Sequence, residues 1–356
     1  MRTKKILLIG LIFVSMILLT GQGCMKVEKK GGGPIDGGIW ISYDKGENWQ
    51  MKALMPTIAG VKNLGDLNVE LLVFDPHDAN TIYWGAGDAG LFVSYDGAES
   101  WQEVKGLPQP RVTDLIVDPV ARNVIYVALN NLIFKSTDCC RSWQNIYIDI
   151  PGVPVNAIAI DPLNSKRILA GLADGRLIKS EDGGVNWVLF NDFKTNIKDI
   201  FFNQQSPKIV YLATQTAGIF RSTDSGNTWN KIEDLDENKF RGVNVFYYGF
   251  FDLTKKDALF ILTDAGFLRS GEGVKNWQDY KLLTQPGRVK INSFTANPKN
   301  PNEIYYATDT TFYKSLNGGI TWITKSLPTT RKPIYLTTNP NNPNILYLGT
   351  YKPPAK

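Results

Sequence analysis

The chain repeats one eight-residue motif, Ser-x-Asp-x-Gly-x-x-Trp, seven times with varying fidelity. Successive copies start 42 to 52 residues apart, close to the length of one four-stranded propeller blade. This period predicts an all-β fold, a seven-bladed β-propeller with four-stranded antiparallel blades. The copies, which we call turn motifs, begin at Ser42, Ser94, Ser136, Ser180, Ser222, Ser270 and Ser315.

The residue types of the turn motif suit a tight connection between two strands. An Asp side chain folds back onto backbone N–H groups, a Gly accepts a positive φ, and a Trp anchors the following strand. Only the Ser and the Trp occur in all seven copies, and Ala98, Cys140 and Val274 replace the Gly in three of them. We therefore interpret the motif as a structural device and not as a catalytic signature.

A second repeat precedes most turn motifs and confirms the period. It consists of an apolar strand, a turn resembling Asp-Pro, and a second strand that ends in a small residue in most copies. The chain opens with a turn motif that lacks these strands (38–50) and closes with a strand pair that lacks its motif (332–349). Pairing of the two chain ends would complete one blade, close the ring and remove exposed sheet edges. We expect a single propeller domain over residues 38–351, followed by a tail at 352–356.

The N-terminal segment is predicted to be a targeting signal. Residues 1–24 combine a basic start, about fifteen mostly apolar residues and Cys24, which resembles a bacterial lipoprotein signal peptide. Gly21 stands where such signals usually carry Leu, so an uncleaved anchor and ordinary secretion stay as alternatives. Residues 25–37 are expected to form a flexible tether. All three alternatives place the propeller outside the cytoplasm, and the first two hold it at a membrane.

Charge and cysteine content exclude several functions. The net charge of +5 is mild for 356 residues, so we expect no nucleic-acid partner. His77 is the only histidine, so we expect no metal site and no cofactor. Cys139 and Cys140 are adjacent, and they could form a vicinal disulfide or remain two thiols in a tight turn.

The turn motif resembles the Asp-box (BNR) repeat of sialidases, xyloglucan-cleaving glycosidases, sortilin-type receptors and photosystem II assembly factors. The resemblance covers residues 38–351. The Arg-Ile-Pro signature of sialidases, the second propeller of the xyloglucan enzymes and the ten blades of sortilins do not occur in this sequence. The assembly factors are most similar, and this resemblance implies a monomeric, non-catalytic scaffold that binds a protein or polymeric partner.

In such propellers the turn motifs lie on the face opposite the usual binding face, so candidate residues come from the other loops. Four loops that enter an innermost strand end at or near an arginine, which could bind carboxylates or phosphates, or could simply be solvated. These candidate partner-binding residues are Arg111, Arg241, Arg288 and Arg331.

Four aspartates follow the second strand of their blades and should lie on the same face. Paired carboxylates are what glycoside hydrolysis requires, although Asp is also ordinary in turns. They support an alternative function, an extracytoplasmic glycosidase acting on a polysaccharide. These weak catalytic candidates are Asp88, Asp174, Asp264 and Asp309.

Overall fold

The computed structural model describes residues 35–108, 111–284 and 288–353. The predicted signal peptide with Cys24, most of the predicted tether and the last three residues of the predicted tail lie outside this part of the chain. No helix within the described ranges is long and apolar enough to cross a membrane.

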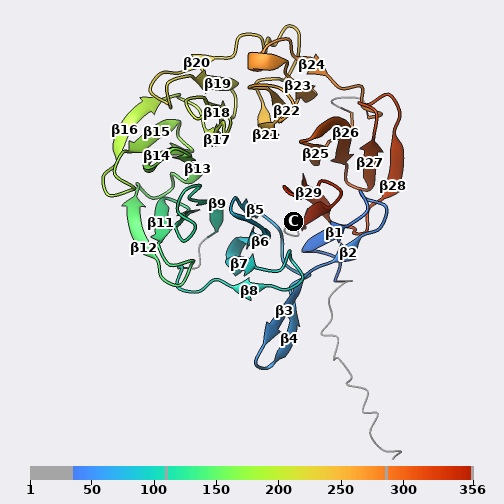
Figure 1. The fold of residues 1–356 in the computed structure, drawn as a ribbon, viewed down its shortest axis with the longest axis horizontal. Coiled ribbons are helices and arrows are strands. Elements are labelled where there is room, and N and C mark those ends of the chain that lie inside the picture. Colours follow the sequence, from blue (N-terminus) through green and yellow to red (C-terminus); the bar gives the residue numbers. More distant parts are fainter. Residues whose placement is uncertain (1–34, 109–110, 285–287, 354–356) are drawn as a thin grey trace, which may run out of the picture. The chain divides into compact units, whose positions relative to one another are not determined.

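Seven four-stranded antiparallel sheets surround a central axis, which confirms the predicted fold (Figure 1). We number the blades in chain order. The strands of blades 1 to 3 are β5 (Leu71–Asp75), β6 (Asp78–Gly85), β7 (Leu91–Ser94) and β8 (Gln102–Glu103); β9 (Val112–Val117), β10 (Ile125–Leu129), β11 (Leu132–Ser136) and β12 (Gln144–Ile148); β13 (Val155–Asp161), β14 (Asn164–Leu172), β15 (Arg176–Ser180) and β16 (Val188–Asp192).

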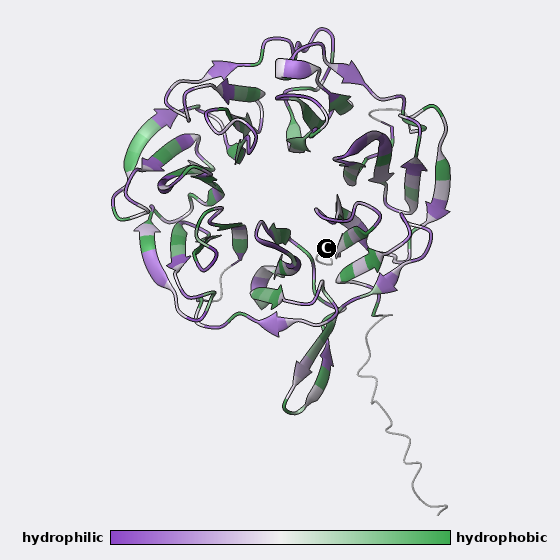
Figure 2. Cartoon of the chain, in the orientation of Figure 1, coloured by the Kyte–Doolittle hydropathy of each residue, from purple (hydrophilic) through white to green (hydrophobic). Residues whose placement is uncertain are grey.

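Blades 4 to 6 repeat the same order from the axis outward. Their strands are β17 (Ile197–Phe202), β18 (Val210–Thr214), β19 (Ile219–Ser222) and β20 (Asn230–Lys231); β21 (Phe246–Phe251), β22 (Leu259–Thr263), β23 (Gly266–Arg269) and β24 (Gln278–Asp279); β25 (Ser293–Asn297), β26 (Asn300–Ala307), β27 (Thr311–Ser315) and β28 (Ile323–Ser326). The second strands are almost wholly buried, so the core lies in layers between neighbouring blades (Figure 2).

Blade 7 joins the two ends of the propeller, as the sequence predicts. It contains β29 (Lys332–Thr338) and β30 (Leu346–Tyr351) from the end of the chain, and β1 (Ile39–Ser42) and β2 (Gln50–Met51) from its beginning. β1 pairs with β30 in antiparallel register, with Trp40 opposite Leu348. The ring is therefore closed by backbone hydrogen bonds between segments about 310 residues apart, the same kind of pairing that joins strands within the other blades.

A two-stranded hairpin outside the blades was not expected from the sequence. It consists of β3 (Leu54–Thr57) and β4 (Gly60–Asn63), which pair only with each other, and it projects outward from the ring (Figure 1). Two short 3-10 helices, η1 (Gly87–Ala89) and η2 (Glu272–Val274), complete the elements of the described residues.

Six of the seven turn motifs keep the bond from the fifth residue's N–H to the Ser hydroxyl, including two copies in which the sequence departs from Gly at that position. In an intact copy, Gly184 N–H donates to Ser180 Oγ at 2.8 Å, and Ser180 donates to Asp182 at 2.8 Å. Cys140 N–H makes the same bond to Ser136 Oγ at 2.9 Å, with a φ of +66°. The copy at Ser270 differs, because its hydroxyl instead accepts the N–H of Leu259.

The Trp of the turn motif is less buried than the sequence led us to expect. Only Trp101 (0 % exposed) and Trp277 (2 %) are buried, and the other five are half-buried. In most copies the Trp is therefore not a fully buried anchor.

A β-bulge recurs near the start of the innermost strand in at least five blades. The pairing of β17 with β18 skips Lys198, and that of β21 with β22 skips Tyr247. Bulges re-aim side chains and often lie beside functional sites.

The small residue predicted at the end of the second strand lets neighbouring blades approach each other closely. A Cβ on Gly171 of blade 3 would lie 2.3 Å from Ile197 Cγ2 of blade 4.

Candidate functional site

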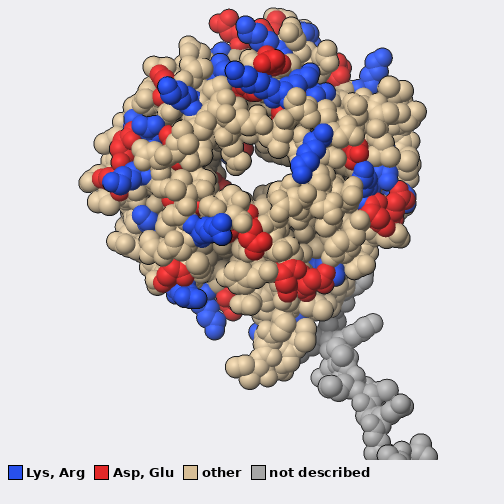
Figure 3. All heavy atoms as spheres, viewed as in Figure 1, with Lys and Arg blue, Asp and Glu red and all other residues tan. Residues whose placement is uncertain are grey.

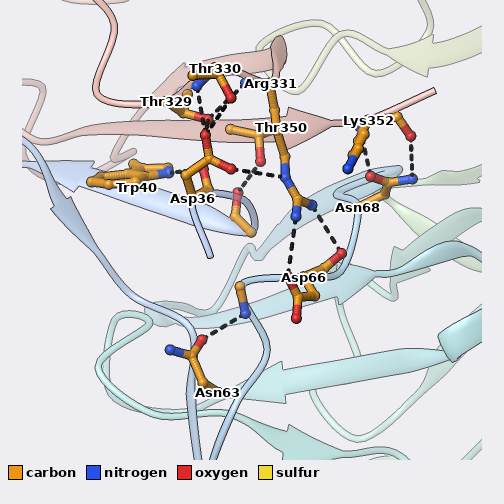
Figure 4. A network of polar contacts seen from close by, with 12 residues as sticks. Asp36, Trp40, Asn63, Asp66, Asn68, Thr329, Thr330, Arg331, Thr350 and Lys352 are labelled. Atoms are coloured by element: carbon orange, nitrogen blue, oxygen red, sulfur yellow. Dashed lines mark hydrogen bonds and ion pairs between the residues drawn. The ribbon is translucent and has the colours of Figure 1, made fainter. Parts of the chain in front are cut away.

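The four candidate arginines do not form one patch, because Arg331 is only 8 % exposed. Its Nη1 donates to the carbonyl of Asp66 at 2.9 Å, and its guanidinium lies 3.4 Å from a carboxylate oxygen of Asp36 and of Asp66 (Figure 4). Burial alone would raise the pKa of Asp36, but hydrogen bonds from Thr330 and the charge of Arg331 outweigh burial and lower that pKa. Arg331 therefore holds the start of the propeller against blade 7, which corrects the expectation that it binds a partner.

The other three arginines are exposed. Arg111 is paired with Glu70 at the start of blade 2. Arg241 and Arg288 stand before the innermost strands of blades 5 and 6, and neither has a hydrogen-bond or ion-pair partner among the described residues. In Figure 3, basic side chains gather over the blade that carries β21 to β24, beside the central opening.

The four candidate aspartates are all exposed and belong to blades 1, 3, 5 and 6. Asp88 lies in η1, and Asp174 forms an ion pair with Arg176 of its own blade (2.7 Å). Asp264 accepts a hydrogen bond from Tyr247, and Asp309 accepts one from Asn292 at 2.8 Å. Only Asp264 and Asp309 belong to neighbouring blades.

Asp264 and Asp309 are held in the same way. Each follows the second strand of its blade and is bonded by a side chain at the start of the innermost strand: Tyr247, the bulged residue of β21, and Asn292, which directly precedes β25. Lys290 links the two blades, with its Nζ 5.9 Å from the centre of the Tyr247 ring. We call Tyr247, Asp264, Lys290, Asn292 and Asp309 the blade 5–6 cluster.

The blade 5–6 cluster combines an accessible aromatic ring with carboxylates. The Tyr247 side chain is large and 46 % exposed. Its hydrogen bond to Asp264, together with partial burial, raises the pKa of Tyr247 to about 12, so the phenol remains a donor at neutral pH. Sequence reasoning missed Tyr247, Lys290 and Asn292, although alignment of the seven innermost strands would have placed Tyr247 and Asn292 in equivalent positions.

The side chains of the blade 5–6 cluster are exposed, except that of Asn292, which is half-buried. Two hollows of about 230 and 220 Å³ lie elsewhere, one between blades 1 and 2 near Leu91 and Leu107, the other across the Asp-Pro turns of blades 1 to 4 near Phe74 and Phe201. Neither hollow is lined by a residue of the cluster.

Two further carboxylates, missed by sequence reasoning, lie on innermost strands. Burial raises the pKa of Asp114 on β9 to about 7, although Ile158 N–H donates to it at 2.7 Å, and the charge of Asp199 adds to the increase. Burial likewise raises the pKa of Asp199 on β17 to about 6. A carboxyl group of this kind keeps its proton to a higher pH in the folded protein than in the unfolded chain.

Asp199→Asn should therefore stabilise the protein at alkaline pH. Because the folded pKa of about 6 exceeds the unfolded value of about 3.9, the stabilisation from the protonated group is complete below pH 4 and is lost as the pH rises through 6. We expect the variant to gain up to about 3 kcal/mol over the wild type at pH 8 and nothing at pH 4. Urea unfolding at both pH values measures this difference, and the exposed substitution Asp88→Asn is the control. An equal gain in stability at pH 4 and pH 8 would contradict the raised pKa of Asp199.

The two adjacent cysteines are free thiols in this structure. Cys139 is exposed and Cys140 is buried, and burial, followed by the nearby Cys139, raises the pKa of the Cys140 thiol to about 12. Across the part of the chain that the structure describes, no group of three or more His, Cys, Asp or Glu side chains is placed to hold a metal ion.

The fold and the cluster define a seven-bladed β-propeller with an aromatic and acidic surface across two neighbouring blades. No protein-family model matches the chain. The chain is 29 % identical over 157 residues to an oligoxyloglucan-reducing end-specific xyloglucanase of Emericella nidulans, which covers 41 % of this chain. The matches span 19 to 29 % of the length of the curated xyloglucanases.

Solved structures share the fold at low identity, as two examples show. A GH74 enzyme of Niastella koreensis superposes with a TM-score of 0.62 and 18 % identity, over 80 % of this chain and 51 % of that chain. YCF48 bound to D1 peptide superposes with a TM-score of 0.59 and 15 % identity, over 82 % of this chain and 94 % of that chain. These likenesses support the propeller architecture.

Proposed function

We propose that the protein acts on a polysaccharide, as a glycoside hydrolase that binds a glucan chain such as xyloglucan at the blade 5–6 cluster. The equivalent positions of Asp264 and Asp309 in neighbouring blades, each with a hydrogen-bond donor from the start of the innermost strand, carry this proposal. The similarity to xyloglucanases supports it. We therefore propose the glycosidase alternative in preference to the non-catalytic scaffold that the sequence resemblance implied.

The chemistry of the cluster fits this substrate class. Glycoside hydrolysis uses one carboxyl group to protonate the leaving oxygen and a second to attack the sugar or to activate water. Asp264 and Asp309 are the candidate pair. The exposed Tyr247 ring offers an apolar face for a sugar ring and a polar hydroxyl at its edge. Asn292 and Lys290 supply donors for sugar hydroxyl groups.

The proposed location is extracytoplasmic. It rests on the sequence of residues 1–24 and on lipidation of Cys24, both outside the described residues. A polysaccharide substrate of the cell exterior agrees with an exported enzyme. We also propose that the protein needs no cofactor and acts as a monomer without a nucleic-acid partner.

Tyr247→Ala should weaken xyloglucan binding by roughly tenfold, the loss expected when about 1.4 kcal/mol of aromatic contact is removed. Isothermal titration with xyloglucan oligosaccharides measures the dissociation constant. Tyr95→Ala is the matched control, because Tyr95 is similarly exposed (50 %) but lies in the turn motif of blade 1. Equal losses in both variants, or none in either, would contradict binding at the cluster.

A second candidate function, a protein-binding scaffold, is favoured by one observation. Arg241 and Arg288 are exposed, without partners among the described residues, and lie on neighbouring blades. A protein surface rich in carboxylates could pair with them. Arg241→Glu combined with Arg288→Glu should then abolish capture of a membrane protein in pull-downs, while xyloglucan binding persists.

A further inference from the structure

The β3–β4 hairpin exposes apolar side chains that the propeller does not cover. Ile58 at its tip is fully exposed (111 %), and Val61 and Leu54 are 67 % and 47 % exposed. Within the hairpin strands only Met55 is buried against the core. Figure 2 shows hydrophobic residues at the end of the hairpin. The fold itself gives no reason for these side chains to be apolar.

Two lysines flank the apolar residues of the hairpin. The uncharged residues 53–61 run between Lys52 and Lys62. Lys52 lies at the base, where it pairs with Glu99, and Lys62 is exposed on β4. An apolar tip with basic residues behind it matches the interface of a lipid bilayer, where lysines extend toward the headgroups.

The start of the propeller lies at the base of the same hairpin. Gly37 N–H donates to the carbonyl of Gly65 at 2.9 Å, and Leu64 N–H donates to that of Ala53 at 2.7 Å. If Cys24 carries a lipid, the twelve residues from it to Asp36 span at most about 40 Å. A lipid anchor would thus hold the hairpin within reach of the membrane.

We propose that the β3–β4 hairpin inserts its tip into the interface of the lipid bilayer, as a second membrane contact beside the N-terminal segment. The hairpin satisfies the backbone groups between its own strands, from Thr57 paired with Gly60 to Leu54 paired with Asn63. The apolar tip then enters the acyl boundary while Lys62 contacts anionic headgroups.

The experiment uses the full chain reconstituted into vesicles of phosphatidylcholine and phosphatidylglycerol, with and without brominated acyl chains. Ile58→Trp places a reporter at the tip, and Leu163→Trp places a matched reporter at an exposed turn of blade 3 (76 % exposed). The fluorescence added by Trp at position 58 should fall by roughly half or more in brominated vesicles, as expected for a side chain ~5–10 Å into the acyl boundary. The fluorescence added by Trp at position 163 should not change.

A second measurement avoids the added Trp, which itself favours interfaces. In unbrominated vesicles, Ile58→Asp combined with Val61→Asp should speed trypsin cleavage after Lys62 roughly tenfold, because a charge disfavours the interface by more than about 1.4 kcal/mol. Cleavage after Lys194, exposed on blade 3, should stay the same. Thermal unfolding of each variant checks that the ring is intact.

Three results would overturn the proposal. The first is an absence of quenching at position 58, and the second is equal quenching at positions 58 and 163. The third is protection of the tip in lipid-free detergent that increases with protein concentration, which would assign the hairpin to contact with a second copy of the chain. None of these results depends on whether the blade 5–6 cluster binds a polysaccharide.

Discussion

Asp309→Asn and Asp264→Asn should each lower the turnover of xyloglucan hydrolysis by roughly 100-fold or more. Asn keeps the shape and an acceptor for the bonds from Asn292 and Tyr247 but can neither hold a transferable proton nor carry charge. Binding should therefore stay within a few-fold of the wild type. Release of reducing ends measures turnover, and titration with oligosaccharides measures binding.

Asp174→Asn and Asp88→Asn are the matched controls, because they lie in the equivalent loops of blades 3 and 1. Turnover should be unchanged in both. If a control variant loses turnover while the Asp264 and Asp309 variants keep it, the active site lies on another blade. Binding of xyloglucan without any hydrolysis by the wild-type protein would overturn the enzymatic part of the proposal and leave a polysaccharide-binding propeller.

Arg331→Met should lower the free energy of unfolding by on the order of 3 kcal/mol at pH 7. The substitution leaves Asp36, whose side chain is 17 % exposed, without its cation and leaves the carbonyl of Asp66 without its Nη1 donor. Removing one member of a buried ion pair is costly because the remaining charge stays desolvated. Urea unfolding followed by tryptophan fluorescence measures the change.

Lys194→Met is the comparison for this prediction, since the side chains of its ion pair with Asp192 are 81 % and 32 % exposed. An exposed pair contributes about 1 kcal/mol or less, so this variant should be nearly as stable as the wild type. Equal stability losses in the two variants would contradict the role of Arg331 in closing the ring.

The blade count and the ring closure were predictable because they depend on spacing alone. The turn motif fixes where each blade turns, and even the copy with Cys140 in place of Gly keeps the bond to Ser136. The small residues at the ends of the second strands were also visible in the sequence. The structure adds their reason, the close approach of neighbouring blades at positions such as Gly171.

The candidate site was predictable only in part, because it depends on contacts between blades. Asp264 and Asp309 were proposed together with Asp88 and Asp174, and the sequence does not show which two occupy adjacent blades with equivalent donors. The burial of Arg331 was missed because its partner Asp36 is 295 residues away in the chain. The β3–β4 hairpin was missed because its residues match neither repeat.

Blade 7 cannot form until the whole propeller has been synthesised. Its four strands come from both ends of the propeller, and β30 is synthesised after the other three. Until β30 arrives, β1 has no inner neighbour and its edge stays open. A propeller cut short before β30 therefore presents unpaired backbone groups to chaperones and proteases, whereas pairing of β30 with β1 covers them in a single step.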